Sequence, residues 1–431
     1  MKGIGVGLLG FGTVGAGVFH ALRNQEDVIL KRTESTFEVR AVLVQNADKK
    51  RVKEVEPLIT TRFDQVMDAD VQVVVEAIGG IEPARTYIEQ AMVAGCHIVT
   101  ANKELVAKHG PELERLARNN GVQFLYEASV GGGIPVLGTL LHLLKSNRIY
   151  RVSGILNGTT NYILTRMADA GVSFDQILAE AQEKGYAEAD PAADVDGFDA
   201  VYKLSILGRL AFGAHIPVPE VRRKGIRDVT AAELELIARL GYRLKLLAVG
   251  EQYGEMGPIS LGVEPTLLPS SHPLASVNGV HNAIHLEGDL VQDVTLVGQG
   301  AGEKPTASAV VEDLCNLSLP VPRRPLDEDP LLLPAAESGG TRFVFLNPRN
   351  TGILDADTLR QRLESIGLTV EGTAVSSQGG AGLILRRWDP SFASVLVAEL
   401  GLDLSNLTTR PVFGSQGVQA DQQQQVGSGA V

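Results

Sequence analysis

The chain has 431 residues, enough for two to four domains at roughly 100–200 residues per domain. Its hydrophobic fraction of 44% and charged fraction of 21% are those of a folded globular protein, which excludes a largely disordered chain. With 39 Lys and Arg against 51 Asp and Glu, the formal net charge is −12, and no Lys/Arg-rich run offsets it. This balance argues against nucleic acid or an anionic membrane as the main partner.

The cellular compartment is predicted from the cysteines and from the lack of a targeting segment. Cys96 and Cys315 are the only cysteines, too few for a disulfide framework in a chain of this length. No stretch resembles a secretory signal, and no apolar run reaches the about 20 residues of a membrane helix. We therefore expect a cytoplasmic protein without a membrane partner.

Strand-like and helix-like segments alternate through residues 1–135. Strands are expected at residues 3–9, 38–44, 71–78, 96–100 and 122–126. Helices are expected at residues 12–24, 82–94 and 108–119. Such alternation predicts parallel β-α-β units, and therefore an α/β chain that opens with a Rossmann-type, doubly wound nucleotide-binding domain.

A different pattern follows in residues 136–299, where longer helices and less regular β-like runs predict an α+β domain. One helix should begin at the capping-box spacing of Ser173 and Gln176 and end near Gly185. Further helices are expected at residues 160–170, 199–212 and 231–240.

A proline-rich segment separates this domain from the C-terminal part of the chain. Residues 320–340 carry five prolines and end in Gly-Gly, so 321–340 is interpreted as a linker. Residues 341–414 follow the β-α-β-β-α-β order of a ferredoxin-like domain, and 415–431 resemble a disordered tail. A boundary in such a linker predicts few contacts across it, so that the chain without its last domain should still fold.

The first chemical signal is a glycine-rich run that follows an apolar strand and opens a helix: Gly10, Phe11, Gly12, Thr13, Val14 and Gly15. A tight turn and the close approach of a pyrophosphate to backbone N–H groups both exclude side chains. The run therefore predicts a dinucleotide site. The alternative is a glycine-rich turn that binds nothing.

The end of the second predicted strand bears on the choice of dinucleotide. A carboxylate there would bind the adenosine ribose, but Gln45 and Asn46 occupy the position, and Lys49, Lys50 and Arg51 follow. A carboxylate would repel a 2′-phosphate, whereas amides and cations accept it. We therefore favour NADP(H), with NAD(H) as the alternative; the cations could equally form an ordinary solvated surface.

Two further segments follow predicted strands, at the sheet edge where ligands gather in doubly wound folds. In the segment TANKEL, Lys103 could reach a cofactor or substrate, although an ordinary surface lysine is the simpler interpretation. In the segment EASVGGGIP, the Glu127 carboxylate and inward-turned carbonyls would suit a hard cation. From the residues alone, we favour a tight crossover between domains for this second segment.

Carboxylates are concentrated in one short stretch: Glu188, Asp190, Asp194, Asp196 and Asp199. A calcium loop with its glycine at Gly197 would need acidic residues where Ala192 and Lys203 stand, so that hypothesis fails. Asp199 and Lys203 are one helical turn apart and share a face. They could form an ordinary ion pair, or a lysine held beside carboxylates that recognise an ammonium group.

Taken in chain order, several blocks resemble homoserine dehydrogenases of the three-domain, monofunctional bacterial form: GLLGFGTVGAGV, VTANKEL, YEASVGGGIPV, GILNGTTNYIL, GYAEADPAADVDGFDAVYKLSIL and GQGAGEKPTASAVVEDL. They cover most of residues 1–320. The resemblance implies a reversible, NAD(P)H-dependent reduction of L-aspartate 4-semialdehyde to L-homoserine, in threonine, methionine and isoleucine biosynthesis.

The resemblance also implies roles for individual residues. Lys203 matches the general acid/base, and Lys103 would lie near the substrate and the nicotinamide. The substrate would be held by Glu188, Asp199, Asp194, Gly185, Gly158 and Thr159. Thr100 and Gly300 would join the glycine-rich run in contacting the cofactor, and the segment 300–320 would return to the nucleotide-binding domain.

Three further expectations rest on the resemblance. A monovalent cation, usually sodium, would be bound by Glu127, Val130, Gly132 and Ile134, largely through carbonyls, which reverses the preference for a simple crossover. The last domain would be ACT-like, with threonine as its effector, although residues 350–354 carry Thr351 where that module usually has proline. Assembly would be a homodimer or homotetramer.

Two rival hypotheses remain at this point. One is an NAD(P)-dependent enzyme for another amino-acid aldehyde, which the GTTN block and the acidic stretch disfavour. The other is a threonine-sensing binding protein that has lost catalysis, which the presence of Lys103, Glu188, Asp199 and Lys203 disfavours.

Overall fold

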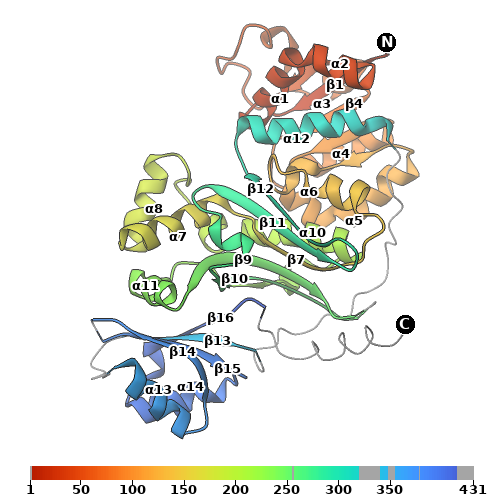
Figure 1. The fold of residues 1–431 in the computed structure, drawn as a ribbon. Coiled ribbons are helices and arrows are strands. Elements are labelled where there is room, and N and C mark those ends of the chain that lie inside the picture. The colour runs from red at the N-terminus through yellow and green to blue at the C-terminus, as the bar shows by residue number, and fades with distance from the viewer. Residues whose placement is uncertain (1, 255–256, 320–339, 348–354, 378, 415–431) are drawn as a thin grey trace, which may run out of the picture.

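Three β-sheets organise the computed structural model, which describes residues 2–254, 257–319, 340–347, 355–377 and 379–414 (Figure 1). The predicted linker, the Asn350–Leu354 turn and the predicted tail therefore lie almost wholly outside the described residues. No helix in the described part of the chain is long and apolar enough to cross a membrane.

The first sheet is parallel throughout, with strand order β3-β2-β1-β4-β5-β6. Its strands are β1 Lys2–Leu9, β2 Ser35–Leu43, β3 Ile59–Thr60, β4 Val73–Glu76, β5 His97–Thr100 and β6 Phe124–Leu125. Its helices are α1 Thr13–Asn24, α2 Glu26–Thr33, α3 Phe63–Met67, α4 Ala84–Val93 and α5 Lys103–Asn119. The order reverses between β1 and β4, as in a Rossmann-type sheet, and the predicted class of this domain is confirmed.

Helix α5 begins five residues before its predicted start, because the side chain of Asn102 accepts a hydrogen bond from Leu105 N at 3.1 Å and caps the helix. Lys103 is thus the first residue of a helix at the carboxyl end of β5. The late helix α12, Glu303–Cys315, returns to pack on α1. A Cβ on Gly17 would stand 2.8 Å from Glu303 Cγ, so the glycine permits this close approach.

The second sheet has the order β12-β11-β7-β9-β10-β8 and is mostly antiparallel. Its strands are β7 Ile149–Ile155, β8 Arg222–Arg223, β9 Tyr242–Gln252, β10 Ile259–Pro269, β11 His281–Gly288 and β12 Gln292–Gln299. The expectation of irregular strands beyond residue 242 was wrong, because β9 and β10 pair along their whole length. Helices packed against this sheet are α7 Gly158–Ala170, α10 Phe198–Phe212 and α11 Ala231–Arg239.

The third sheet, order β14-β15-β13-β16, is antiparallel and belongs to a β-α-β-β-α-β unit, as predicted. Its elements are β13 Arg342–Leu346, α13 Ala356–Ser365, β14 Thr369–Val375, β15 Ala381–Arg386, α14 Ser391–Leu400 and β16 Leu407–Pro411. The two helices cover the face of the sheet that points away from the second sheet (Figure 1).

The C-terminal unit is docked on the second domain through buried contacts, so the expectation of few contacts across the linker was wrong. Arg410 of β16 is fully buried and pairs with Glu233 of α11 at 2.8 Å. On the same face, Gly382 of β15 lies against Leu236, where a Cβ would be 3.2 Å away. Phe343 and Ile384 join the same hydrophobic cluster as the second domain. Proline content marked the connection but carried no information about this docking.

Candidate active site

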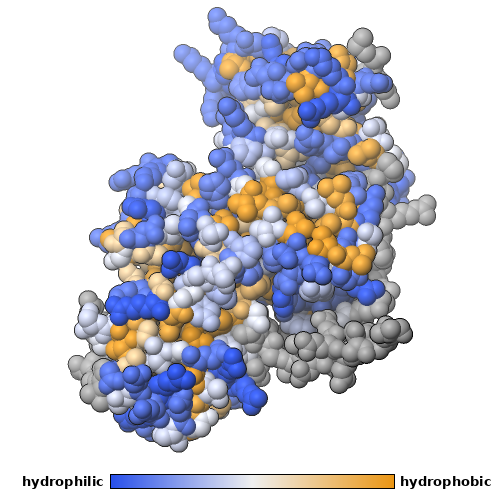
Figure 2. Space-filling model, viewed as in Figure 1, coloured by the Kyte–Doolittle hydropathy of each residue, from blue (hydrophilic) through white to orange (hydrophobic). Residues whose placement is uncertain are grey.

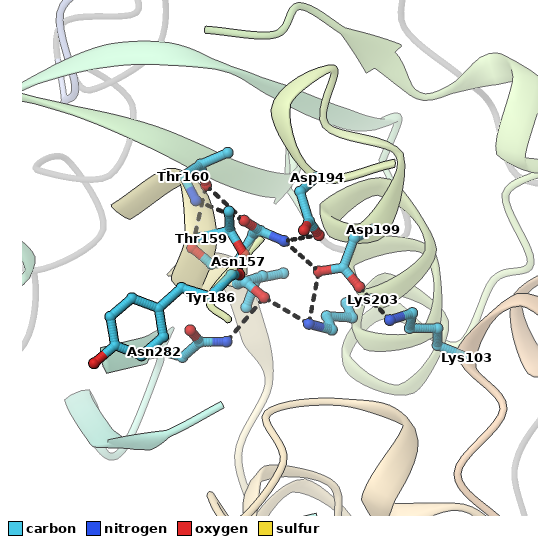
Figure 3. A network of polar contacts seen from close by, with 10 residues as sticks. Lys103, Asn157, Thr159, Thr160, Tyr186, Asp194, Asp199, Lys203 and Asn282 are labelled. Atoms are coloured by element: carbon cyan, nitrogen blue, oxygen red, sulfur yellow. Dashed lines mark hydrogen bonds and ion pairs between the residues drawn. The ribbon is translucent and has the colours of Figure 1, made fainter. Parts of the chain in front are cut away.

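A polar network lies where the first two domains meet (Figure 3). It draws side chains from the N-terminus of α5, the β7–α7 connection, the short helix α9 (Ala192–Val195), α10 and β11. The residues are Lys103, Asn157, Asp194, Asp199, Lys203 and Asn282, together with the Leu156 carbonyl. The structure thus brings together Lys103 and Lys203, two lysines separated by 100 residues of sequence.

Asp199 is the centre of this network. Its Oδ2 accepts from Lys203 Nζ at 2.7 Å and from Asn157 Nδ2 at 3.0 Å, while its Oδ1 pairs with Lys103 Nζ at 2.5 Å. The Asp199 side chain is only 5% exposed. Both of its oxygens are therefore in contact with ammonium or amide groups of the protein.

The two lysines have opposite environments. The Lys203 side chain is 9% exposed, and burial together with the charge of Lys103 lowers its pKa, although Asp199 opposes this. Lys103 is 44% exposed; burial works against its charge too, but Asp199, Asp194 and Glu188 outweigh it and raise the pKa of Lys103. Burial also works against the Asp199 charge, yet the two ammonium groups hold its pKa below the ordinary range.

The remaining predicted substrate residues lie around the same network. Asp194 Oδ1 accepts from Asn157 Nδ2 at 2.7 Å, and burial and then the charge of Asp199 raise the pKa of Asp194. Glu188 is exposed, and its carboxylate makes no hydrogen bond or ion pair with any described residue. The hydroxyl of Thr159 donates to Tyr186 O at 2.7 Å, which ties the start of α7 to the acidic loop.

The local structure explains why glycine occupies two of the positions predicted to bind the substrate. A Cβ on Gly158, the first residue of α7, would stand 2.7 Å from Val280 O. Gly185 has φ +73° directly after α8, Phe174–Glu183, a conformation that glycine adopts without strain.

The glycine-rich run forms the turn between β1 and α1. Gly10 has φ +98°, and a Cβ on Gly15 would lie 2.1 Å from Gly10 O, so both are needed for the turn itself. A Cβ on Gly12 would meet no protein atom within 4 Å. No side chain caps α1, which leaves the backbone N–H groups at Thr13 and Val14 for a ligand. The turn therefore fits a dinucleotide pyrophosphate.

Thr100, expected at the cofactor, turns its hydroxyl into the protein. It donates to Glu76 Oε2 at 2.5 Å and accepts from Asn102 N at 3.0 Å, and its side chain is buried. The other oxygen of Glu76 accepts from Ile78 N at 2.7 Å and Gly79 N at 3.1 Å. Glu76 thus fixes the loop beside the glycine-rich turn.

Comparison with known proteins identifies the family. A homoserine dehydrogenase family model matches residues 135–315, and a model of the NAD binding domain of homoserine dehydrogenase matches residues 10–127. Homoserine dehydrogenase of Synechocystis is 46% identical over 349 residues, 80% of this chain and 79% of that protein. The Bacillus subtilis enzyme is 43% identical over 73% of this chain and 72% of its own. The chain belongs to the homoserine dehydrogenase family.

Solved homoserine dehydrogenases have the same fold. The enzyme from Thiobacillus denitrificans superposes with a TM-score of 0.84 at 36% identity, over 97% of this chain and 99% of that one. A hyperthermophilic archaeal homoserine dehydrogenase, solved in complex with NADPH, has a TM-score of 0.62 at 28% identity, over 75% of this chain and 100% of its own. The chain is accordingly an NAD(P)-dependent oxidoreductase that acts on the CH–OH group of homoserine.

The segment predicted to bind a cation follows β6 in the first domain. Glu127 is buried, its carboxylate accepts from Leu137 N at 2.9 Å and Gly138 N at 2.6 Å, and burial raises its pKa to about 7. A Cβ on Gly132 would lie 2.5 Å from the carbonyl of Gly300, so the loop abuts that glycine.

The oxygen atoms in this loop fit a hard cation. Among the described residues no backbone N–H donates to the carbonyl oxygens of Val130 and Gly132, whereas Ile134 O accepts from Val136 N at 2.8 Å. Within the described ranges, no group of three or more His, Cys, Asp or Glu side chains is arranged so that it could hold a metal ion. One carboxylate with free carbonyls is an all-oxygen donor set, which is suited to a hard cation rather than to a softer transition metal.

Asn157 and Asn282, which belong to the polar network, and Glu76, which holds the loop beside the glycine-rich turn, were not singled out from the sequence. Asn157 is the N-cap of α7, and its Oδ1 accepts from Thr160 N at 2.8 Å while its amide binds Asp194 and Asp199. The position of Asn157 before a helix was a cap signal that could have been read. Glu76 and Asn282 lie in strands with no local motif, so only their tertiary contacts reveal them.

Proposed function

We propose that Lys203 is the general acid that protonates the aldehyde oxygen of L-aspartate 4-semialdehyde, and the general base in the reverse direction. The arrangement of its ammonium group carries this proposal. Two of its three N–H groups are taken by Asp199 Oδ2 and Leu156 O, each at 2.7 Å, which leaves one proton for the substrate. Because its pKa is lowered, Lys203 gives up this proton more readily than an ordinary lysine.

The chain's own residues handle the charge that develops on the reacting oxygen. When bound, the nicotinamide cofactor supplies the hydride that reduces the aldehyde carbon. The Lys203 ammonium stabilises the growing negative charge and then transfers its proton to it. Lys103, on the opposite side of Asp199, adds a second positive charge beside the substrate.

The substrate is an amino acid, and the acidic groups around the network fit its ammonium. Glu188 is exposed and unpaired among the described residues, and Asp194 is partly exposed, so these two carboxylates are the proposed ammonium ligands. Gly158, Thr159 and Gly185 would shape the pocket through their backbone. Asp199 acts as the positioning link between the lysines.

Substitution of the two lysines tests this assignment. We expect Lys203→Ala to lower kcat by roughly 10²–10⁴-fold, the usual contribution of a positioned general acid, with the Kd for NADPH nearly unchanged. Lys103→Ala should raise KM as well as lower kcat. Lys184→Ala, which removes a surface lysine paired with Glu180, is the matched control. A Lys203→Ala enzyme with more than about half of wild-type kcat would contradict the assignment.

We propose that the cofactor is NADP(H), bound by the glycine-rich run with Lys103 and Gly300. Gln45 is exposed at the end of β2, and Arg51 is fixed there by donating to Asn46 O and Lys49 O at 2.8 Å each. A neutral amide with an arginine nearby suits a 2′-phosphate. Gln45→Asp should raise KM for NADPH and spare NADH; equal losses with both cofactors would place Gln45 away from the ribose.

We propose that sodium occupies the loop of Glu127, Val130, Gly132 and Ile134. The support is the buried Glu127 carboxylate together with the carbonyls of Val130 and Gly132, to which no described backbone N–H donates and which a cation would compensate. Thermal unfolding compared in sodium chloride and in choline chloride at equal ionic strength tests this. Sodium should raise Tm of the wild type and leave Glu127→Gln less affected.

We also propose an oligomeric state, an effector and a cellular location for the enzyme. Leu290 and Val297 are exposed apolar side chains beside and on the edge strand β12, where Figure 2 shows an apolar patch, and we propose that this face forms a homodimer or homotetramer. Threonine is proposed to act through the C-terminal ACT-like unit, and the enzyme to work in the cytoplasm. Sedimentation and inhibition assays with threonine test the first two.

A further inference from the structure

Asn282 is a buried side chain at the start of β11 that none of the roles above includes. It is 1% exposed, and its Nδ2 donates to Leu156 O at 2.8 Å (Figure 3). The same carbonyl accepts from Lys203 Nζ at 2.7 Å. Because this backbone group offers only an oxygen, the Asn282 atom that faces it must be the amide nitrogen.

The Leu156 carbonyl is not held by a β-ladder. It lies between the end of β7 at Ile155 and the helix cap Asn157. In the described part of the chain, the donors to this oxygen are the side chains of Lys203 and Asn282. Since a carbonyl oxygen has two lone pairs, these two hydrogen bonds together fix its direction.

The oxygen of the Asn282 amide argues against a purely structural role. Its Oδ1 is buried and accepts no hydrogen bond from any described residue. The amide is fitted between two glycines, because a Cβ on Gly300 would stand 1.9 Å from Nδ2 and one on Gly158 would stand 3.5 Å from Oδ1. A buried amide that is only half satisfied is rare in packing and more typical of a functional site.

We propose that Asn282 is a positioning residue for the reaction, because it holds the Leu156 carbonyl against Lys203 and so directs the third ammonium proton to the substrate. This inference rests on the proposed role of Lys203. The charged groups that face Lys203 are Asp199 on α10, Lys103 on α5 and Asp194 on α9. Asn282 is thus the uncharged side chain among the groups around Lys203, and it affects the reaction only through the position of Lys203.

Two substitutions test the proposal on the full-length enzyme. We expect Asn282→Ala to lower kcat by about ten-fold or more, part of the effect of a positioned acid, with KM for homoserine and for NADP changed less than about two-fold. Without its held acceptor the ammonium is less stable, so the basic limb of the kcat–pH profile for aldehyde reduction should move to lower pH. Asn282→Asp conserves the shape but removes the donor, and should also lower kcat.

Asn161→Ala is the matched control. Asn161 is also 1% exposed, and its amide donates to Val277 O at 3.1 Å and His281 O at 3.0 Å, away from Leu156. We expect it to lower Tm but leave the pH profile unchanged. A superimposable pH profile with kcat within about two-fold of wild type for Asn282→Ala, or the same profile shift in Asn161→Ala, overturns the proposal. An active Lys203→Ala enzyme would instead overturn the proposed function beneath it.

Discussion

Lys245 shows what burial does to a cation that has no carboxylate among its hydrogen-bond acceptors. Its Nζ donates to Val277 O at 2.6 Å and to Asn161 Oδ1 and Asn278 Oδ1 at 3.0 Å each. All three donors are satisfied, but by neutral groups, and burial lowers the pKa of Lys245 to about 8. Lys203 is as deeply buried and has Asp199 to offset the cost. Comparison of the two lysines shows that neutral hydrogen-bond acceptors alone do not offset the cost of burying an ammonium group, whereas a carboxylate acceptor offsets part of it.

The lowered pKa of Lys245 predicts a pH-dependent stability. Between about pH 8 and the ordinary value of 10.5, the folded protein has released a proton that the unfolded chain still binds, so the folded state gains stability as pH rises. At about 1.4 kcal/mol per unit, the gain reaches at most roughly 3.5 kcal/mol. Urea denaturation should show the free energy of unfolding of wild type rising relative to Lys245→Met over this range. A constant difference between the two proteins would contradict the burial argument.

At the scale of the element, the turn between β1 and α1 separates two kinds of glycine. Gly12→Ala should keep Tm and lose cofactor affinity, because its methyl group meets no protein atom and would enter the space of the pyrophosphate. Gly15→Ala should lower Tm, because its methyl group would lie 2.1 Å from Gly10 O. Thermal unfolding without cofactor and titration with NADPH measure the two effects. Equal loss of Tm in both variants would show that Gly12 is also structural.

Local sequence patterns predicted the helices and strands better than they predicted the polar network of the candidate active site. Five of the six strands of the first sheet, all but β3, and the β-α-β-β-α-β unit were found because apolar runs and helical spacing are local in sequence. The short helix α2, Glu26–Thr33, was missed because only Ile29 of it is buried, so it has no apolar face to read. Asp199 and Lys203 were paired by helical spacing, but Lys103 and Asn282 join them only through tertiary contacts. Contacts between residues that are this far apart in the sequence leave no periodic pattern in it.

Across the whole molecule, the last domain is in direct contact with the second. Arg239 of α11 donates to Val375 O at 3.0 Å, and Phe413 N donates to Leu267 O of β10 at 2.9 Å. A Cβ on Gly372 of β14 would stand 3.1 Å from Leu240 Cδ2. Removing the domain would expose this apolar face of α11 to water. We therefore expect a chain that ends before residue 340 to be destabilised, in contrast to the expectation from linker composition alone.

Arg410 provides the sharpest test of this docking. Its guanidinium is fully buried, its Nε and Nη2 donate to Glu233 at 2.8 and 3.1 Å, and its Nη1 reaches Asp228 at 3.1 Å. Arg410→Met would leave Glu233, 1% exposed, as an unpaired buried charge, which typically costs about 3–5 kcal/mol. Urea denaturation should show this loss, and Glu233→Gln added to Arg410→Met should recover part of it, because the unpaired buried charge is then gone.

Arg362→Met, which removes an exposed arginine paired with Glu399 inside the last domain, is the control and should change stability by less than about 1 kcal/mol. If Arg410→Met unfolds like the wild type and the shortened chain stays soluble and active, the docking contributes little and the two domains are independent.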